Sequence, residues 1–362
     1  TPRFQFKNLR YLVGLKLEGE AHLEGNTQGD SHAATLDMNI NGKDLFLSQF
    51  YLGQAQTSLN YKKGILTFKN LVGKIGGSEY KANVEVDAVQ SLIQVDGGAE
   101  KADVKEIMSA FQRLVQLPIE LTGIANVKVK GGGPFELNQL SYQLEADVFK
   151  STIANESFEK IEAKLVSQNG EVKIEKALLK KQKSEIRAFG VGHPNGDIDL
   201  TVQGKDLLLE ESENIARLGA FIQGRLDATL KLQGYVLAPD SKLDLMIKQL
   251  SIEDQEFPGS EFNFVLGRKQ ISGKANLVGG HLLAELIWPL TEDSPFYLKA
   301  KANNWNYTTL FTLVGGGSIL SDYTAGLSGD IELSSAKGGF ANSTGSGKIT
   351  SLFLKRGNLS LY

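Results

Sequence analysis

Apolar and polar residues alternate along most of this chain with a period of two. In the clearest runs Leu, Ile, Val or Ala occupies every second position, and polar or charged residues lie between. Such alternation is typical of β-strands that have one apolar side and one solvent-facing side. Clusters of Gly, Asn and Asp separate the runs at intervals of about ten residues, which predicts an antiparallel sheet of strands joined by turns.

Three short stretches depart from this alternation and predict helices, near residues 103–115, 209–218 and 307–314. In the first, Asp103 is placed to cap the helix, and Glu106 stands where a capping-box partner would. The apolar residues that follow return at helical spacing. The second and third stretches have looser versions of the same pattern.

The helical stretches belong to a longer repeat. Each helical stretch follows a pair of consecutive residues in which Asp or Asn precedes an apolar residue. These pairs are Asp103-Val104, Asp206-Leu207 and Asn304-Trp305. Glycines that open alternating strands recur at intervals of 104, 101 and 105 residues, at Gly19, Gly123, Gly224 and Gly329. Agreement between independent landmarks indicates a structural repeat of about 100 residues.

This repeat predicts the organisation of the chain. We expect a first repeat over 1–118, a second over 119–219, a third over 220–321 and the start of a fourth over 322–362. No Pro-rich, Ser-rich or charged linker separates them. The predicted fold is therefore mainly β, an elongated and curved antiparallel β-sheet solenoid with about eight strands per repeat. Its apolar side would form an open trough, with the short helices as caps.

Composition narrows the functional classes. With 39 Lys and Arg against 42 Asp and Glu, the net charge is -3, and we expect no nucleic-acid partner. The chain has no cysteine, and no apolar stretch is long enough to predict a membrane-spanning helix. The chain starts with Thr1 and stops within an alternating run, so we expect it to be a segment of a longer protein.

Catalytic and metal-binding patterns fail on inspection. The histidines His22, His32, His193 and His281 are scattered, without metal-ligand spacing. Ser346 lies in a Gly-Ser-Gly-Lys stretch, but a phosphate loop would need Gly at 342 and Ser or Thr at 349, where Asn and Ile stand. Asp197 and Asp199 begin like a calcium loop whose sixth position is Val202 rather than Gly. We expect no enzyme activity, no metal and no cofactor.

The candidate binding surface is the apolar side of the sheet as a whole. Each methylene buried there is worth about 0.8 kcal/mol, so a smooth aliphatic lining suits phospholipid acyl chains. The residues expected to line this groove are Leu15, Leu17, Leu140, Tyr142, Leu144, Val148, Ile198, Leu200, Val202, Leu226, Leu230, Leu232, Leu243, Leu245 and Ile247.

The pattern resembles a known family. A glycine pair leads into a strand at 277–286, a strand leads into a short helix at 300–311, and glycine-led strands follow at 327–333 and 343–350. In these features the chain resembles the AsmA-like superfamily of Gram-negative envelope proteins, to which AsmA, YhdP and TamB belong. The resemblance implies a periplasmic protein, tethered to the inner membrane by a segment not in this chain. It also implies phospholipid transport to the outer membrane.

Two alternatives remain open from the sequence. One is a scaffold that assists outer-membrane protein assembly, in which a sheet edge pairs with strands of a β-barrel client. The other is an inert structural solenoid whose interior is filled by its own side chains. Lipid transport requires lipid as the partner, the assembly scaffold requires a protein client, and the inert solenoid requires neither.

Overall fold

The computed structural model describes residues 4–5, 17–29, 35–47, 50–110, 120–135, 139–252, 255–267, 269–291, 294–306, 323–337, 340–356 and 359–361. Of these residues, 78% lie in strands, and the strands form one antiparallel sheet that is open rather than closed on itself. The predicted fold class is confirmed in these respects. The chain divides into two compact units, described separately below.

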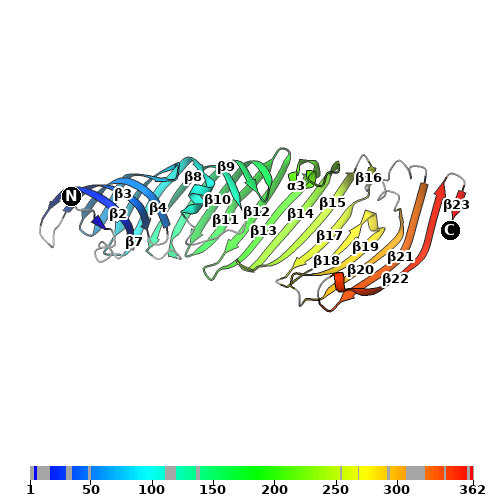
Figure 1. The fold of residues 1–362 in the computed structure, drawn as a ribbon. Coiled ribbons are helices and arrows are strands. Elements are labelled where there is room, and N and C mark those ends of the chain that lie inside the picture. The colour runs from blue at the N-terminus through cyan, green and yellow to red at the C-terminus, as the bar shows by residue number, and fades with distance from the viewer. Residues whose placement is uncertain are drawn as a thin grey trace. The chain divides into compact units, whose positions relative to one another are not determined.

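Unit 1 comprises residues 1–181 and 189–195. Figure 1 shows its strands running side by side, each antiparallel to the next in the chain. They are β1 (Phe4–Gln5), β2 (Leu17–Gln28), β3 (Thr35–Leu47), β4 (Phe50–Lys62), β5 (Ile65–Ile75), β6 (Ser78–Asp87), β7 (Leu92–Asp103), β8 (Leu121–Pro134), β9 (Ser141–Ile153), β10 (Glu156–Gln168) and β11 (Glu171–Lys181), with helix α2 (Val104–Ser109) after β7.

Unit 2 comprises residues 182–188 and 196–362, so β12 (Ser184–Gly192) has residues in both units. Its strands are β13 (Asp197–Leu208), β14 (Ile222–Tyr235), β15 (Asp240–Ile252), β16 (Gln255–Phe257), β17 (Ser260–Leu266), β18 (Gln270–Leu277), β19 (Leu282–Pro289), β20 (Phe296–Asn306), β21 (Tyr323–Ser335), β22 (Thr344–Arg356) and β23 (Leu359–Leu361). Its helical turns are η3 (Leu209–Glu211), α3 (Glu213–Ala216), η4 (Val278–Gly280) and η6 (Phe340–Asn342).

The strands are longer and fewer than the sequence predicted. From β8 to β13 six strands occur, between 9 and 14 residues long, where about eight were expected. The reason is that strands continue through breaks in the alternation. At Lys164/Leu165, for example, the pairing of β10 with β11 shifts by a β-bulge and then resumes. A bulge reverses the apparent alternation without ending the strand.

The glycines that mark the predicted repeat mark recurring bulges. Register shifts occur at or next to Gly19, Gly123, Gly224 and Gly329. The first three glycines are each the third residue of their strand, and Gly329 lies in the middle of β21. Gly123 has φ +139 and Gly19 has φ +116, and residues with a Cβ atom rarely adopt these backbone conformations. Backbone conformation therefore explains why glycine is found at Gly19 and Gly123.

A second set of bulges recurs at the end of the strand before each position where the sequence predicts a helix. Lys101, Asp206 and Asn304 adopt φ values of 52, 51 and 47. The backbone N–H of each donates to a side chain on the next strand. The acceptors are Asn126 Oδ1 at 2.9 Å, Asp227 Oδ1 at 2.8 Å and Ser328 Oγ at 2.8 Å. The described parts of the sheet thus have a repeat-like architecture.

The helices are shorter than predicted. Asp103 does cap α2, accepting from the N–H groups of Lys105 and Glu106. The helix ends at Ser109, and residues 111–119 lie outside the described part. The second predicted helix is interrupted at Ser212, whose backbone is extended and whose side chain caps a new turn at Ile215. The third, over 307–314, also lies outside the described residues.

Glu106 has a different role from the one predicted. Its carboxylate does not return to Asp103 as a capping box would. It accepts from the N–H of Gly77 at 2.8 Å and from the hydroxyl of Ser78 at 2.5 Å, in the β5–β6 turn. The bonds from Gly77 and Ser78 lower the pKa of Glu106. We call this arrangement the turn–helix lock.

A related contact occurs one repeat later. Glu211 Oε1 accepts from the N–H of Lys183 at 3.1 Å, in the β11–β12 turn. The serine after each turn also accepts from the backbone where the helical stretch begins, Ser78 from Asp103 at 2.8 Å and Ser184 from Leu208 at 3.0 Å. The two described helical stretches are therefore each fastened to the hairpin turn of two strands earlier.

Candidate functional site: an apolar sheet face and a pocket

One face of the unit 2 sheet carries apolar residues in continuous cross-strand rows. Two rows run across the strands from β13 or β14 to β21 without a charged residue. The first row is Val202, Leu230, Leu243, Phe264, Gly273, Leu286, Leu298 and Leu333. The second is Ala228, Leu245, Phe262, Ala275, Ala284, Ala300 and Ile331. We call this side of each unit the apolar face.

Unit 1 has an apolar face built in the same way. Its rows cross from β3 or β6 to β11. One row is Ala82, Gly97, Val129, Leu144, Leu165 and Ile174. The other is Met38, Leu59, Phe68, Val84, Val95, Gly131, Tyr142, Ser167 and Val172. Partial burial raises the pKa of Tyr142.

The opposite face carries ion pairs. Lys164 lies 3.7 Å from Glu145 and 3.3 Å from Glu175, which joins three neighbouring strands. Hydrogen bonds from Lys176 and Lys160 lower the pKa of Glu162 to about 2. Exposed pairs of this kind contribute little to stability individually. They do, however, establish which face is solvated and leave the other as the apolar side.

The structure places most of the predicted lining residues on the apolar face of their own unit. Leu144 pairs with Leu165, Leu200 with Leu232 and Val202 with Leu230, all on the apolar face. The register puts the remaining described residues, which are Tyr142, Val148, Ile198, Leu226, Leu243, Leu245 and Ile247, on the same side. Leu140 precedes β9 and packs against the unit 1 core. Leu15 and the Leu17 side chain lie outside the described part.

The apolar face is buried to different extents along the sheet. In β2–β7 of unit 1, Ile40, Leu59 and Val86 are 5%, 4% and 2% exposed and form a packed core. In unit 2, Leu230, Leu243 and most of their row are only half-buried by the described residues, and Ile331 is 41% exposed. Apolar surface left open to water is the usual mark of a binding surface.

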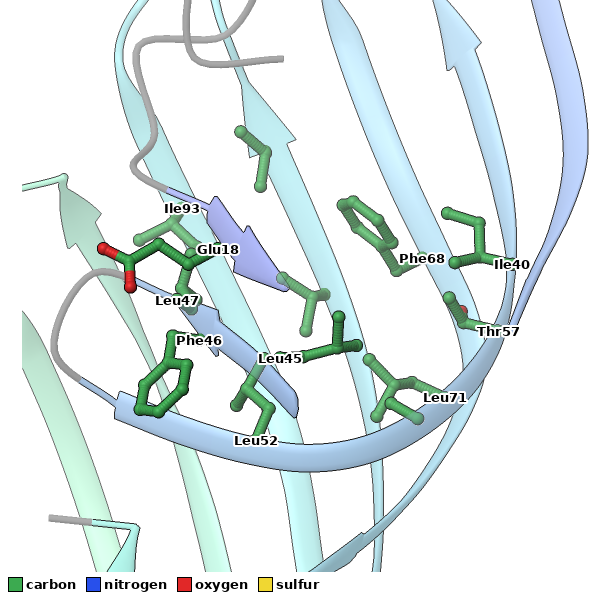
Figure 2. A pocket seen from close by; sticks show the side chains of 13 residues that line it. Glu18, Ile40, Leu45, Phe46, Leu47, Leu52, Thr57, Phe68, Leu71 and Ile93 are labelled. Atoms are coloured by element: carbon green, nitrogen blue, oxygen red, sulfur yellow. The ribbon is translucent and has the colours of Figure 1, made fainter. Parts of the chain in front are cut away.

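A pocket opens within the unit 1 core (Figure 2). Its volume is about 90 Å³. The lining is apolar except for Thr57 and Glu18, and the Thr57 hydroxyl donates to the carbonyl of Lys69 at 3.0 Å. The lining residues are Glu18, Ile40, Leu45, Phe46, Leu47, Leu52, Ala55, Thr57, Phe68, Leu71, Val84, Val86 and Ile93.

The end of the β3–β4 hairpin forms one wall of this pocket. Register shifts at Gly42/Leu45 and Leu45/Phe46, with Asp44 at φ 52, bend β3 near its end. Figure 2 shows β4 curving around the pocket, with Leu52 and Thr57 on it. The bend brings Leu45, Phe46 and Leu47 into the lining with Phe68 and Leu71 of β5.

Two further contacts hold this wall in place. The N–H of Tyr51 donates to the carbonyl of Ala110, next to α2, at 3.0 Å. The hydroxyl of Tyr80 donates to the carbonyl of Leu52 at 2.7 Å, and its ring covers Gly73. Burial raises the pKa of the Tyr80 hydroxyl. The pocket therefore belongs to a fixed part of the unit 1 sheet.

The sequence did not single out the pocket residues. The bulges that bend β3 near its end leave no recognisable pattern in the sequence. The dense apolar stretch from Leu45 to Leu52 was the available signal. Leu45, Phe46 and Leu47 are three consecutive apolar residues, so a search for strict alternation passes over them.

Clusters of polar side chains that could form a catalytic or metal site are sparse among the described residues. Among the described residues, no three His, Asp or Glu side chains are grouped so as to hold a metal ion. His193 lies 3.4 Å from Glu171, and His281 Nδ1 lies 2.9 Å from the carbonyl of Asn303. In the same described part, no helix has the length and apolar character required to cross a bilayer.

Fold and surface together define an open antiparallel β-sheet protein of repeat-like build with one apolar face. Comparisons with known proteins add no family to this description. No protein-family model, no curated protein and no solved structure matches the chain.

Proposed function

We propose that the chain binds phospholipid acyl chains along its apolar face and passes them along it, as part of a lipid-transport protein. The observation that carries this proposal is the set of uninterrupted apolar rows. In unit 2 the row from Val202 to Leu333 crosses from β13 to β21 without a charge and stays half-exposed in the described part.

The lining suits movement rather than capture at one point. Its members are mostly Leu, Ile, Val and Ala, which offer no hydrogen bond that would fix an acyl chain in one place. Each buried methylene contributes about 0.8 kcal/mol wherever along the face it lies. A tail can therefore shift along a row while exchanging one set of equivalent contacts for another.

The setting that we propose follows from the resemblance to the AsmA-like superfamily. It places the protein in the periplasm, tethered to the inner membrane, with phospholipid moving towards the outer membrane in support of outer-membrane integrity. The cysteine-free composition and near-neutral charge are compatible with that setting.

Native mass spectrometry of the purified protein tests the lipid proposal directly. We expect adducts with the masses of phospholipids, removed by a detergent wash and restored by vesicles. The strand-pairing scaffold predicts protein clients instead of lipid, and the inert solenoid predicts neither. Absence of lipid adducts, both as purified and after incubation with vesicles, would contradict the proposal.

A further inference from the structure

The pocket in unit 1 differs from the rest of the apolar face because it is small and walled. The rows of unit 2 are half-open, whereas the pocket lies among residues such as Ile40 and Val86 that are 5% and 2% exposed. The bent end of β3 and the start of β4 form its wall. A chain that slid along the face into this region would meet a wall.

We propose that this pocket receives the methyl end of a single unbranched acyl chain and stops it there. The inference rests on the proposed function, because it takes the ligand to be lipid. It adds that unit 1 contains a terminal site with a defined depth. The occupant is the tail of a fatty acid or of one chain of a phospholipid.

The size of the pocket selects a chain end. A volume of about 90 Å³ corresponds to roughly six to nine water-sized groups at 10–15 Å³ each, and to fewer of the larger methylene groups. That is room for the last few carbons of one chain. Two chains side by side would not fit.

The polarity of the lining selects the apolar end of the lipid. The hydroxyl of Thr57 already donates to Lys69 O. Glu18 is the one ionisable residue of the lining, and Figure 2 shows its carboxylate pointing away from Phe68 and Leu71. A polar or charged head group would lose its water without gaining partners, which is costly. The carboxylate or phosphate of the ligand therefore stays outside.

Photoreactive fatty acids test the orientation on the unaltered protein. One probe carries a diazirine at its terminal carbon, and a matched probe carries it beside the carboxylate. We expect the terminal probe to label the segments 45–47, 50–52 and 66–71, and the carboxyl-proximal probe to leave them unlabelled. Equal labelling by both probes would overturn the proposal.

Chain length gives a second and independent measurement. Affinity for saturated fatty acids of increasing length should rise about fourfold per methylene until the pocket is full, and then rise less steeply, because further methylenes lie on the half-open part of the apolar face. Leu71→Ala deepens the pocket and should move the break to chains about three carbons longer, the number of side-chain carbons removed. Ala55→Val fills space and should move it to shorter chains. A break that stays in place in both folded variants would overturn the proposal.

The same experiment separates this inference from the proposed function. If the probes label unit 2 rows such as 228–232 and 243–247 but never the pocket segments, the terminal site is wrong and lipid binding stands. If neither probe labels any part of the protein, lipid binding itself is wrong. Both results are read from one set of peptide maps.

Discussion

At the residue scale, side chains on successive positions of one strand face opposite environments. Leu230 lies in a charge-free row between Val202 and Leu243, while its neighbour Lys231 is exposed beside Lys242. This contrast makes it possible to change one face without the other.

A lysine on the apolar face should block lipid movement. Leu230→Lys and Leu144→Lys each place a charge in a row that a passing acyl chain must cover, and that burial is unfavourable. We expect lipid transfer between vesicles to fall severalfold, with the β-type circular dichroism spectrum retained. Gln233→Lys and Gln143→Lys, on exposed positions of the same strands, are the matched controls. Equal loss in both pairs would mean that the apolar face has no special role.

The turn–helix lock predicts a pH-dependent stability. The bonds from Gly77 and Ser78 hold the folded-state pKa of Glu106 below its ordinary value of 4.5. The carboxylate therefore stabilises the fold above about pH 4.5, and that contribution is lost as the pH falls through the folded-state pKa. Glu106→Gln should lower the melting temperature at pH 7, and the difference from the natural protein should shrink below pH 4.5.

Glu85→Gln is the control for this measurement. Glu85 is an exposed residue on β6 of the same unit, and its removal should change the melting temperature little at any pH. If the difference in melting temperature between Glu106→Gln and the natural protein stays constant from pH 7 to pH 3, the lost interaction does not depend on the ionised carboxylate of Glu106.

At the scale of elements, the bulges decide where strands bend and where helices attach. Gly329 belongs to the recurrent set, and a Cβ built there would lie 2.4 Å from the carbonyl oxygen of Lys348. At Gly347, on the paired strand β22, the nearest atom would be 3.5 Å away. The two glycines of one hairpin thus differ in how closely the neighbouring backbone approaches.

A pair of alanine substitutions tests the importance of the bulge. Gly329→Ala should destabilise the protein by about 1–3 kcal/mol, because the paired strand must move away. Gly347→Ala should change stability by no more than about 0.5 kcal/mol. Chemical denaturation followed by tryptophan fluorescence measures both. Similar losses of stability at Gly329 and Gly347 would show that the bulge at Gly329 is not important for the stability of the sheet.

The sequence was most informative about these elements where local rules suffice. Alternation identified the faces of β9, β13, β14 and β15, because side chains on a strand alternate whatever the tertiary context. Helix lengths were overestimated, since Ser212 offers a competing cap that ends one turn and begins another. The pocket was missed because it depends on the bend of β3 near Leu45, which brings together residues distant in the chain.

At the scale of the whole molecule, lipid contact should be distributed over both units. The apolar rows are as continuous in unit 1 as in unit 2. A photo-crosslinking residue at Leu144, Leu200, Leu230 or Leu245 should therefore capture phospholipid at every position. Replacement of Gln143 or Lys231, on the opposite face, should capture none.

The distribution of crosslinks distinguishes the candidate functions. Capture at one position alone would indicate a carrier with a single site rather than a path. Crosslinks to protein, concentrated on a strand with an unpaired edge, would favour the scaffold that assists outer-membrane protein assembly.

The order of strand pairing has a consequence for how such a chain folds. Each pairing described joins strands that follow one another in the sequence, and β15 to β17 skips only the three residues of β16. Closing short loops costs little entropy, and folding is fastest where contacts are local in sequence. The sheet can therefore extend hairpin by hairpin while the polypeptide is still being synthesised. No described strand has to wait, exposed to aggregation, for a partner that emerges hundreds of residues later.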